Sequence, residues 1–141
     1  MPLAADHDLV LAKVSTIRKW VATIRALRAA DAPTREAWIL QDVTVLNLQR
    51  TAQACLDLGN HLIAANRWEL PRSARHAFQV LAENGVVDRT LLQVMVGVMG
   101  FRNIAVHDYA TLDPAVVEAI ASGHLGDLEA FADVVVGRVF G

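Results

Sequence analysis

The chain has 141 residues, 54% of them hydrophobic, and a formal net charge of −2. This length suits a single domain, residues 1–141, with a sizeable hydrophobic core, and the net charge argues against a general nucleic-acid binder or a membrane-surface protein. The charge is uneven, because residues 1–75 carry ten Lys and Arg against seven Asp and Glu whereas residues 76–141 carry three against eight, so the first half could still bind a polyanion locally.

Two long helices are predicted for the first half of the chain. Over residues 8–29, apolar side chains recur at steps of four and three and form one stripe. These are Val10, Val14, Ile17, Val21 and Ile24. A break follows at residues 31–34, where Thr34 is a candidate cap for a second helix from near residue 35 to about residue 66. That helix is longer than usual, and we expect a bend near Gly59.

A connector and a short third helix follow. Pro71 prevents a simple continuation of the second helix. Ser73 is a plausible cap for a helix through about Glu83, and Asn84-Gly85 is a good stop signal.

The fourth predicted helix, over about residues 89–108, is the central one. Asp88 caps it, and the run from Leu91 to Val98 is apolar almost all round, which predicts burial on several sides. Gly97 and Gly100 weaken a helix by about 1 kcal/mol each relative to alanine. We therefore expect them to let another backbone approach closely, within the fold or across a dimer interface.

The C-terminal part restarts at Asp113-Pro114, a cap followed by proline at the first helical position. The segment runs through Ala121, is interrupted at Gly123, and an amphipathic pattern then continues to the end. No alternating strand pattern, repeat or low-complexity tract is present. The sequence predicts an all-α bundle of about five helices.

The remaining composition narrows the classes of function. Cys55 is the only cysteine, so an internal disulfide is excluded, and no Cys/His cluster suggests a metal site. Asp6, His7 and Asp8 stand where a signal peptide would need an apolar core, and no run approaches the roughly 20 apolar residues of a membrane span. We expect a cytoplasmic protein that contacts no membrane.

The densest group of chemically active side chains lies at the end of the fourth helix. At 100° per residue, Arg102 and Tyr109 fall within about 20° of each other on an ideal helix, whereas His107 lies about 140° from Arg102 and close to Asn103. The helix would thus present an Arg/Tyr stripe and an Asn/His stripe. Asp108 adds a carboxylate beside His107.

This segment resembles a known signature. Gly100–Tyr109, GFRNIAVHDY, is similar to the Arg-x4-His-x-Tyr motif of the HEPN superfamily, and in particular of its HepT-like branch. Ala54–Ile63, ACLDLGNHLI, resembles the second-helix segment of that branch, with its acidic residue and Asn-His pair. The helix order and the restart at Asp113-Pro114 also fit, so the resemblance covers most of the chain.

The resemblance implies a HEPN-like helical fold and a small ribonuclease toxin that needs neither metal nor cofactor. Arg102 and His107 would be the catalytic pair, in a cleft formed between the chains of a homodimer or a higher oligomer. The partner would be an MntA-like minimal nucleotidyltransferase antitoxin, which silences the toxin by attaching AMP to Tyr109.

The chemistry of these residues agrees with RNA cleavage. The reaction needs a base for the 2′-hydroxyl proton, an acid for the leaving 5′-oxygen, and positive charge at the phosphorus centre. Imidazole exchanges protons near neutral pH, which suits His107 to either proton role, and the guanidinium fork of Arg102 matches phosphate.

Alternatives remain open at each position. Arg102 could be a structural arginine paired with Asp57, and Tyr109 a packing residue. His107 could be a helix-end histidine that interacts with the C-terminal helix dipole. Asn103 and Asp108 either orient His107 or lie on the helix surface. At the level of function, the competing hypotheses are a non-catalytic helical module that docks on a nucleotidyltransferase and presents substrate, and a purely structural helical dimer.

Further candidates lie elsewhere in the chain. Asp57 and His61, one turn apart, could pair and line the cleft. The basic cluster of Arg67, Arg72 and Arg75 could contact the RNA backbone. The other three histidines lie outside any constellation and are predicted to be surface residues: His7, His76 and His124.

Overall fold

The computed structural model describes residues 1–29 and 37–141, and all of its regular elements are helical. The predicted break at residues 31–34, the Thr34 cap and the start of the second helix near residue 35 lie outside the described residues. The elements are α1 (His7–Ala29), α2 (Ala37–Ala65), α3 (Ala74–Glu83), α4 (Arg89–His107), the 3-10 turn η1 (Tyr109–Thr111), α5 (Pro114–Gly123) and α6 (Leu125–Phe140).

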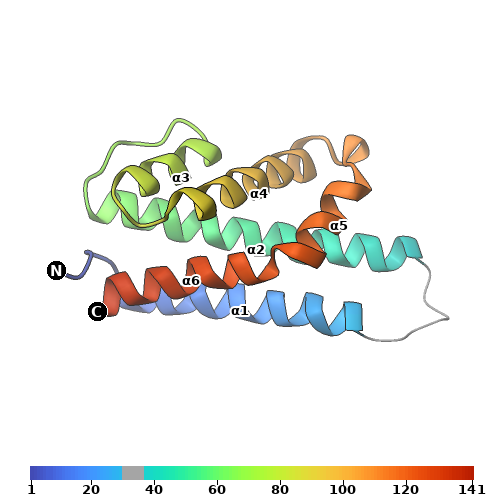
Figure 1. The fold of residues 1–141 in the computed structure, drawn as a ribbon, viewed down its shortest axis with the longest axis horizontal. Coiled ribbons are helices and arrows are strands. Elements are labelled where there is room, and N and C mark those ends of the chain that lie inside the picture. The colour runs from blue at the N-terminus through green and yellow to red at the C-terminus, as the bar shows by residue number, and fades with distance from the viewer. Residues whose placement is uncertain (30–36) are drawn as a thin grey trace.

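Helix α2 is the centre of the bundle. It packs against α1 and α6 on one side and against α3 and α4 on the other (Figure 1). Helix α4 runs back along α2, so that its C-terminal end lies toward the beginning of α2, where α5 and η1 also lie (Figure 1). This arrangement places Arg102 beside Gln53 and Tyr109 beside Asp42 of α2.

The core follows the apolar stripes of the sequence. The five α1 residues of the predicted stripe are the buried residues of that helix. Three phenylalanines fill the middle of the bundle, and the rings of Phe78 and Phe131 meet edge to face at 5.3 Å. Burial of such apolar surface is the main force that holds the helices together.

Helix boundaries agree with the predicted caps. The side chains of Ser73, Asp88 and Asp113 each accept a hydrogen bond from a backbone N–H in the first turn of the following helix. The interruption at Gly123 divides the C-terminal part into α5 and α6, with His124 between them. The all-α prediction is therefore confirmed, with six α-helices in the described residues.

Three helical glycines differ in what surrounds them. α2 continues through Gly59, where a Cβ would lie 3.0 Å from Leu81 Cδ1, so the glycine makes room for α3. A Cβ on Gly100 would meet the Arg75 guanidinium at 2.7 Å, and a Cβ on Gly97 would meet nothing within 4 Å. The prediction that another backbone of the fold approaches these two glycines closely is therefore wrong. A flexible arginine side chain lies over Gly100, and the space over Gly97 is open.

Replacing Gly97 by alanine is expected to raise the free energy of unfolding by about 0.5–1 kcal/mol. Alanine loses less backbone entropy on forming a helix, and the new methyl group meets no neighbour. Urea unfolding followed by circular dichroism measures the change, with Gly59→Ala as the control that should destabilise or stay neutral because Leu81 must move. A destabilised Gly97→Ala protein would show that this face is covered in solution.

No helix in the described residues is both long and apolar enough to span a membrane.

Candidate active site

The side chain of Arg102 is held by two amide groups. Its Nε and Nη2 atoms both donate to Gln53 Oε1, at 3.1 and 2.9 Å, and Nη1 donates to Asn103 Oδ1 at 2.9 Å. Gln53 lies on α2, 49 positions away in sequence, so the contact joins the two helices. The guanidinium is half-buried and has a defined orientation.

The charge of Arg102 is not neutralised by these contacts. Both acceptors are neutral amide oxygens, and among residues 1–29 and 37–141 no carboxylate forms an ion pair with this guanidinium. Three of the five N–H donors of an arginine are engaged, which leaves one on each terminal nitrogen. An oriented, uncompensated guanidinium with two unused donors is suited to bind a phosphate group.

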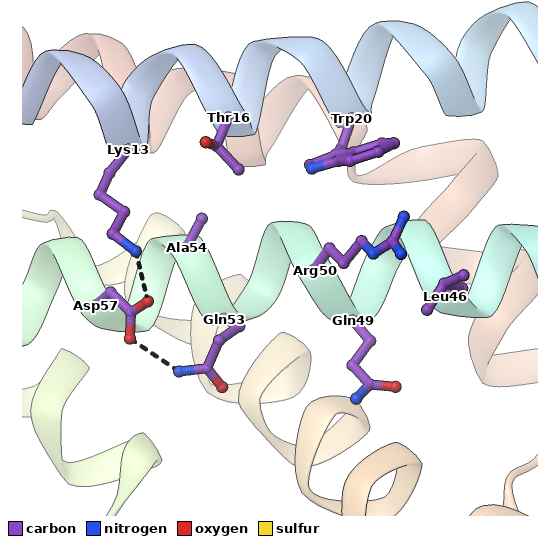
Figure 2. A pocket seen from close by; sticks show the side chains of 9 residues that line it. All are labelled: Lys13, Thr16, Trp20, Leu46, Gln49, Arg50, Gln53, Ala54 and Asp57. Atoms are coloured by element: carbon purple, nitrogen blue, oxygen red, sulfur yellow. Dashed lines mark hydrogen bonds and ion pairs between the residues drawn. The ribbon is translucent and has the colours of Figure 1, made fainter.

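Gln53 is itself fixed by a chain of polar contacts. Its Nε2 atom donates to Asp57 Oδ1 at 2.8 Å, and Lys13 Nζ of α1 lies 2.9 Å from Asp57 Oδ2 (Figure 2). The three residues line one end of an open groove of about 480 Å³ between α1 and α2. Arg102 is therefore connected to Asp57 through Gln53 and not by the direct ion pair considered from sequence.

His107 is the last residue of α4 and its side chain is exposed. Among the described residues no hydrogen bond engages its imidazole. Asn103 is one turn away, but its amide oxygen accepts from Arg102, so Asn103 orients the arginine and not the histidine. Asp108 is the C-cap residue, and its backbone N–H donates to the Ile104 carbonyl at 2.8 Å.

Tyr109 does not continue the helix. Asp108 adopts a non-helical backbone (φ −153°), and Tyr109 begins the separate turn η1. The predicted Arg102/Tyr109 stripe therefore does not form, because it required an unbroken helix through residue 109. The phenol instead donates to Asp42 Oδ1 of α2 at 2.7 Å, while 49% of Tyr109 remains exposed.

The bond to Asp42 keeps the phenol of Tyr109 protonated. Hydrogen bonding to this carboxylate, with smaller effects of burial and of its negative charge, raises the pKa of Tyr109. Because the folded pKa exceeds the unfolded value of about 10, the bond stabilises the fold below pH 10 and the contribution is lost as the pH rises through the folded value.

Asp57 and His61 do not pair, contrary to the prediction. Asp57 is engaged by Lys13 and Gln53, whereas His61 Nε2 accepts the backbone N–H of Asp6 at 2.8 Å. Residues one helical turn apart can form a pair, but here each side chain has another partner. The partner of Asp57 is Lys13 of α1, and that of His61 is the backbone of Asp6, just before α1. Asp57 is thus linked to Arg102 through Gln53, and His61 anchors the N-terminal segment.

The arginines of the predicted basic cluster are exposed. The guanidinium of Arg75 lies over Gly100 of α4. Arg67 has φ 57° in the turn after α2. The Arg72 backbone N–H donates to His76 Nδ1 at 3.0 Å.

The other histidines have structural roles. His76 is buried, with 7% exposure, so the prediction of a surface residue is wrong there. Its place in the first turn of α3 turns it toward the bundle, and its backbone N–H donates to Ser73 Oγ. His7 lies 4.6 Å from the Phe140 ring, between centroids, and His124 Nδ1 lies 2.9 Å from Asp127 Oδ2.

Neither a thiol nor a metal cluster adds to the site. Burial raises the pKa of the Cys55 thiol, which stays protonated in the core. In the part of the chain that the structure describes, no three His, Cys, Asp or Glu side chains are grouped closely enough to hold a metal ion.

Sequence reasoning missed two residues of this site, Gln53 and Asp42, and the ion-pair role of Lys13. Each contacts its partner across helices, 49, 67 and 44 positions apart. Gln53 was recognisable only as a polar position on an otherwise apolar helix. No local spacing pairs it with Arg102.

A protein-family model described as "Ribonuclease HepT-like" matches residues 17–135. The chain is 34% identical over 129 residues to the mRNA nuclease HepT of Shewanella oneidensis, and the match covers 92% of this chain and 97% of that relative.

Solved structures are similar as well. The tri-AMPylated HEPN toxin of Shewanella oneidensis, in complex with MNT antitoxin, superposes with a TM-score of 0.83 at 34% identity, over 92% of this chain and 98% of that chain. YutE of Bacillus subtilis, a cytosolic protein of unknown function, superposes with a TM-score of 0.81 over 97% of this chain and 92% of that one. At 17% identity, the second likeness shows the fold alone.

Proposed function

The chain belongs to the HepT-like ribonuclease family, and we propose that it is the toxin of a toxin–antitoxin pair, an RNase that cleaves RNA, mRNA included, without a metal ion. The HEPN-like helical fold expected from the sequence is confirmed by the comparison with the Shewanella toxin. The observation that carries the proposal is the guanidinium of Arg102, which in the described residues is held by the neutral amides of Gln53 and Asn103, five positions before the exposed His107 on α4.

Arg102 and His107 have different roles in the cleavage reaction. The 2′-oxygen of the RNA attacks the adjacent phosphorus, the bond from phosphorus to the 5′-oxygen breaks, and protons move from the attacking to the leaving oxygen. His107 serves as proton carrier. The two remaining donors of Arg102 bind the non-bridging oxygens, whose negative charge grows in the transition state. Asn103, Gln53 and Asp57 act through Arg102 by fixing its orientation, and Asp108 ends the helix at His107.

A complete cleft needs two chains. One chain supplies a single Arg102 and a single His107, about 140° apart around the helix axis. A two-fold dimer brings the same surface of a second chain opposite the first, so the arginine of one protomer faces the histidine of its partner. Exposed Ile104 and Val106 on this end of α4 provide apolar surface for such a contact.

The negative net charge requires a local RNA path. The exposed Arg67 and Arg72 lie between α2 and α3, and the exposed Arg75 in the first turn of α3 places its guanidinium over Gly100 of α4. We infer that they bind the RNA backbone beyond the cleaved phosphate.

Silencing by AMP transfer to Tyr109 is part of the proposal. The relative was solved AMPylated and in complex with its MNT antitoxin, and Tyr109 is the single tyrosine of this chain. Its oxygen lies on a half-exposed side chain, two residues beyond His107, where a transferase can reach it. An AMP group there adds bulk and a phosphate charge two residues beyond His107, and this negative charge repels the RNA phosphates that must reach the histidine.

The test is cleavage of labelled mRNA and tRNA in EDTA by protein whose intact mass shows no AMP adduct. We expect cleavage, and its loss after incubation with the minimal nucleotidyltransferase, ATP and Mg²⁺, together with an added mass of AMP that Tyr109→Phe protein does not gain. Absence of cleavage by folded, unmodified protein would instead support a non-catalytic module that docks on the nucleotidyltransferase.

A further inference from the structure

We propose that Asp42 is the base that takes the phenol proton of Tyr109 when AMP is transferred to it, so that the toxin supplies a catalytic residue for its own silencing. The proposal rests on the modification of Tyr109 put forward above. Asp42 lies on α2, outside the motif, and no part of the RNA-cleavage chemistry uses it.

The geometry carries the assignment. The hydroxyl of Tyr109 donates to Asp42 Oδ1 at 2.7 Å, a distance typical of a strong O–H···O⁻ contact. A candidate base must lie within hydrogen-bond reach of the proton that it removes, and here the base and the proton are already in contact. The carboxylate is exposed and, among the described residues, forms no ion pair with a Lys, Arg or His side chain.

The phenol is held in place for the reaction. The turn that carries it is closed by hydrogen bonds from Thr111 N and Oγ1 to the Asp108 carbonyl, at 3.0 Å each, and from Leu112 N to the Tyr109 carbonyl at 3.1 Å. The ring is therefore fixed from two sides, by η1 and by α2, while its outer face stays open to a second protein.

The surroundings of Asp42 are apolar along its own helix. Trp38 and Leu46, one turn before and one turn after it, are 64% and 45% exposed. A transferase that covers these side chains would exclude water from the hydrogen bond between Tyr109 and Asp42. Proton transfer to the carboxylate is favoured when water no longer solvates its charge. The other titratable side chains near the phenol are Asp108 and His107, which precede it in the chain. Neither is hydrogen-bonded to the phenol in the described structure.

The step is balanced with ATP as co-reactant. The Tyr109 oxygen attacks the α-phosphorus, a bond from oxygen to phosphorus forms, and the bond from the α-phosphorus to the bridging oxygen breaks to release pyrophosphate. The phenol proton passes to Asp42, which later returns it to water. In the product, Tyr109 carries AMP in place of the hydroxyl hydrogen, so its hydrogen bond to Asp42 is lost. The phosphate of the attached AMP and the carboxylate of Asp42 then repel each other.

The test compares Asp42→Asn with wild type as substrates of the minimal nucleotidyltransferase. Asparagine keeps the shape and an acceptor oxygen but cannot take the proton. With saturating toxin, ATP and Mg²⁺, we expect the maximal rate of AMP addition, read by intact mass, to fall at least about a hundredfold. Asp8→Asn, an exposed carboxylate at the start of α1, is the matched control and should be modified at the wild-type rate.

The pH profile separates a base from a positioning group. Relative to wild type, the rate for Asp42→Asn should rise about tenfold per pH unit between pH 7 and 9, as the phenolate fraction grows. The rise in absorbance at 295 nm with pH reports ionisation of Tyr109 alone, because it is the single tyrosine of the chain. The midpoint of this rise should fall in the variant, because the carboxylate that raises the pKa of Tyr109 is gone.

Two results would overturn the proposal. One is AMP addition to Asp42→Asn protein at the wild-type rate, even if a second variant, Asp42→Ala, is modified slowly. A hydrogen-bond acceptor at position 42 would then be enough for the reaction, and no base would be needed there. The other is a slowed variant with an unchanged pH profile, which would mean that Asp42 positions or docks and removes no proton. Failure of the wild type itself to gain AMP would instead contradict the proposed silencing, so the two hypotheses fail separately.

Discussion

Alanine at His107 or Arg102 is expected to reduce cleavage of unmodified RNA by about 10²–10⁴-fold and 10²–10³-fold respectively, in a metal-free assay. The first figure is typical of losing a general acid or base, and the second of losing a preorganised charge at the transition state. Initial rates on a labelled mRNA in EDTA measure both. Neither change should unfold the protein, because His107 is exposed and Arg102 is linked to neutral amides.

Matched controls distinguish the site from general effects of charge. Arg89→Ala removes an exposed arginine at the other end of α4, and His7→Ala removes an exposed histidine from α1. Both should cleave at nearly the wild-type rate. Arg102→Lys keeps the charge but not the planar fork, so we expect activity between those of wild type and alanine. Cleavage by either alanine variant at the wild-type rate would remove that residue from the mechanism.

Mixing the two inactive variants is expected to restore activity. If the cleft takes Arg102 from one protomer and His107 from its partner, a heterodimer of Arg102→Ala and His107→Ala chains retains one of each on opposite sides. Random exchange makes about half of the dimers heterodimers. Each heterodimer retains one of its two composite sites, so the mixture should then reach roughly a quarter of wild-type activity, from a starting level near zero.

Two tags, one on each variant, allow the heterodimer to be purified and its composition checked. The isolated heterodimer should be more active than the mixture, and dilution below the dimer dissociation constant should abolish the activity. An inactive heterodimer would place Arg102 and His107 of the same chain in one site, and the composite cleft would then be wrong.

The local rules of helix formation were readable from the chain. The apolar stripe of α1, the caps Ser73, Asp88 and Asp113, and the interruption at Gly123 all act over one or two turns, and each is present in the fold. The signature around Arg102, His107 and Tyr109 is likewise contiguous, so its resemblance to the HepT-like branch required no knowledge of packing. Family, helical class and the motif itself were determined by the sequence.

The partners of those residues were decided by tertiary structure. Whether Arg102 meets Asp57 or Gln53 depends on the depth and rotation at which α4 packs on α2, and helical periodicity contains no such information. The end of α4 at His107 turned Tyr109 away from the arginine stripe and onto Asp42. The Arg102–Gln53 and Tyr109–Asp42 contacts join residues 49 and 67 positions apart, and they form only when the helices pack. The pattern along one helix specifies which face of that helix is buried, but not which side chain of another helix lies against that face.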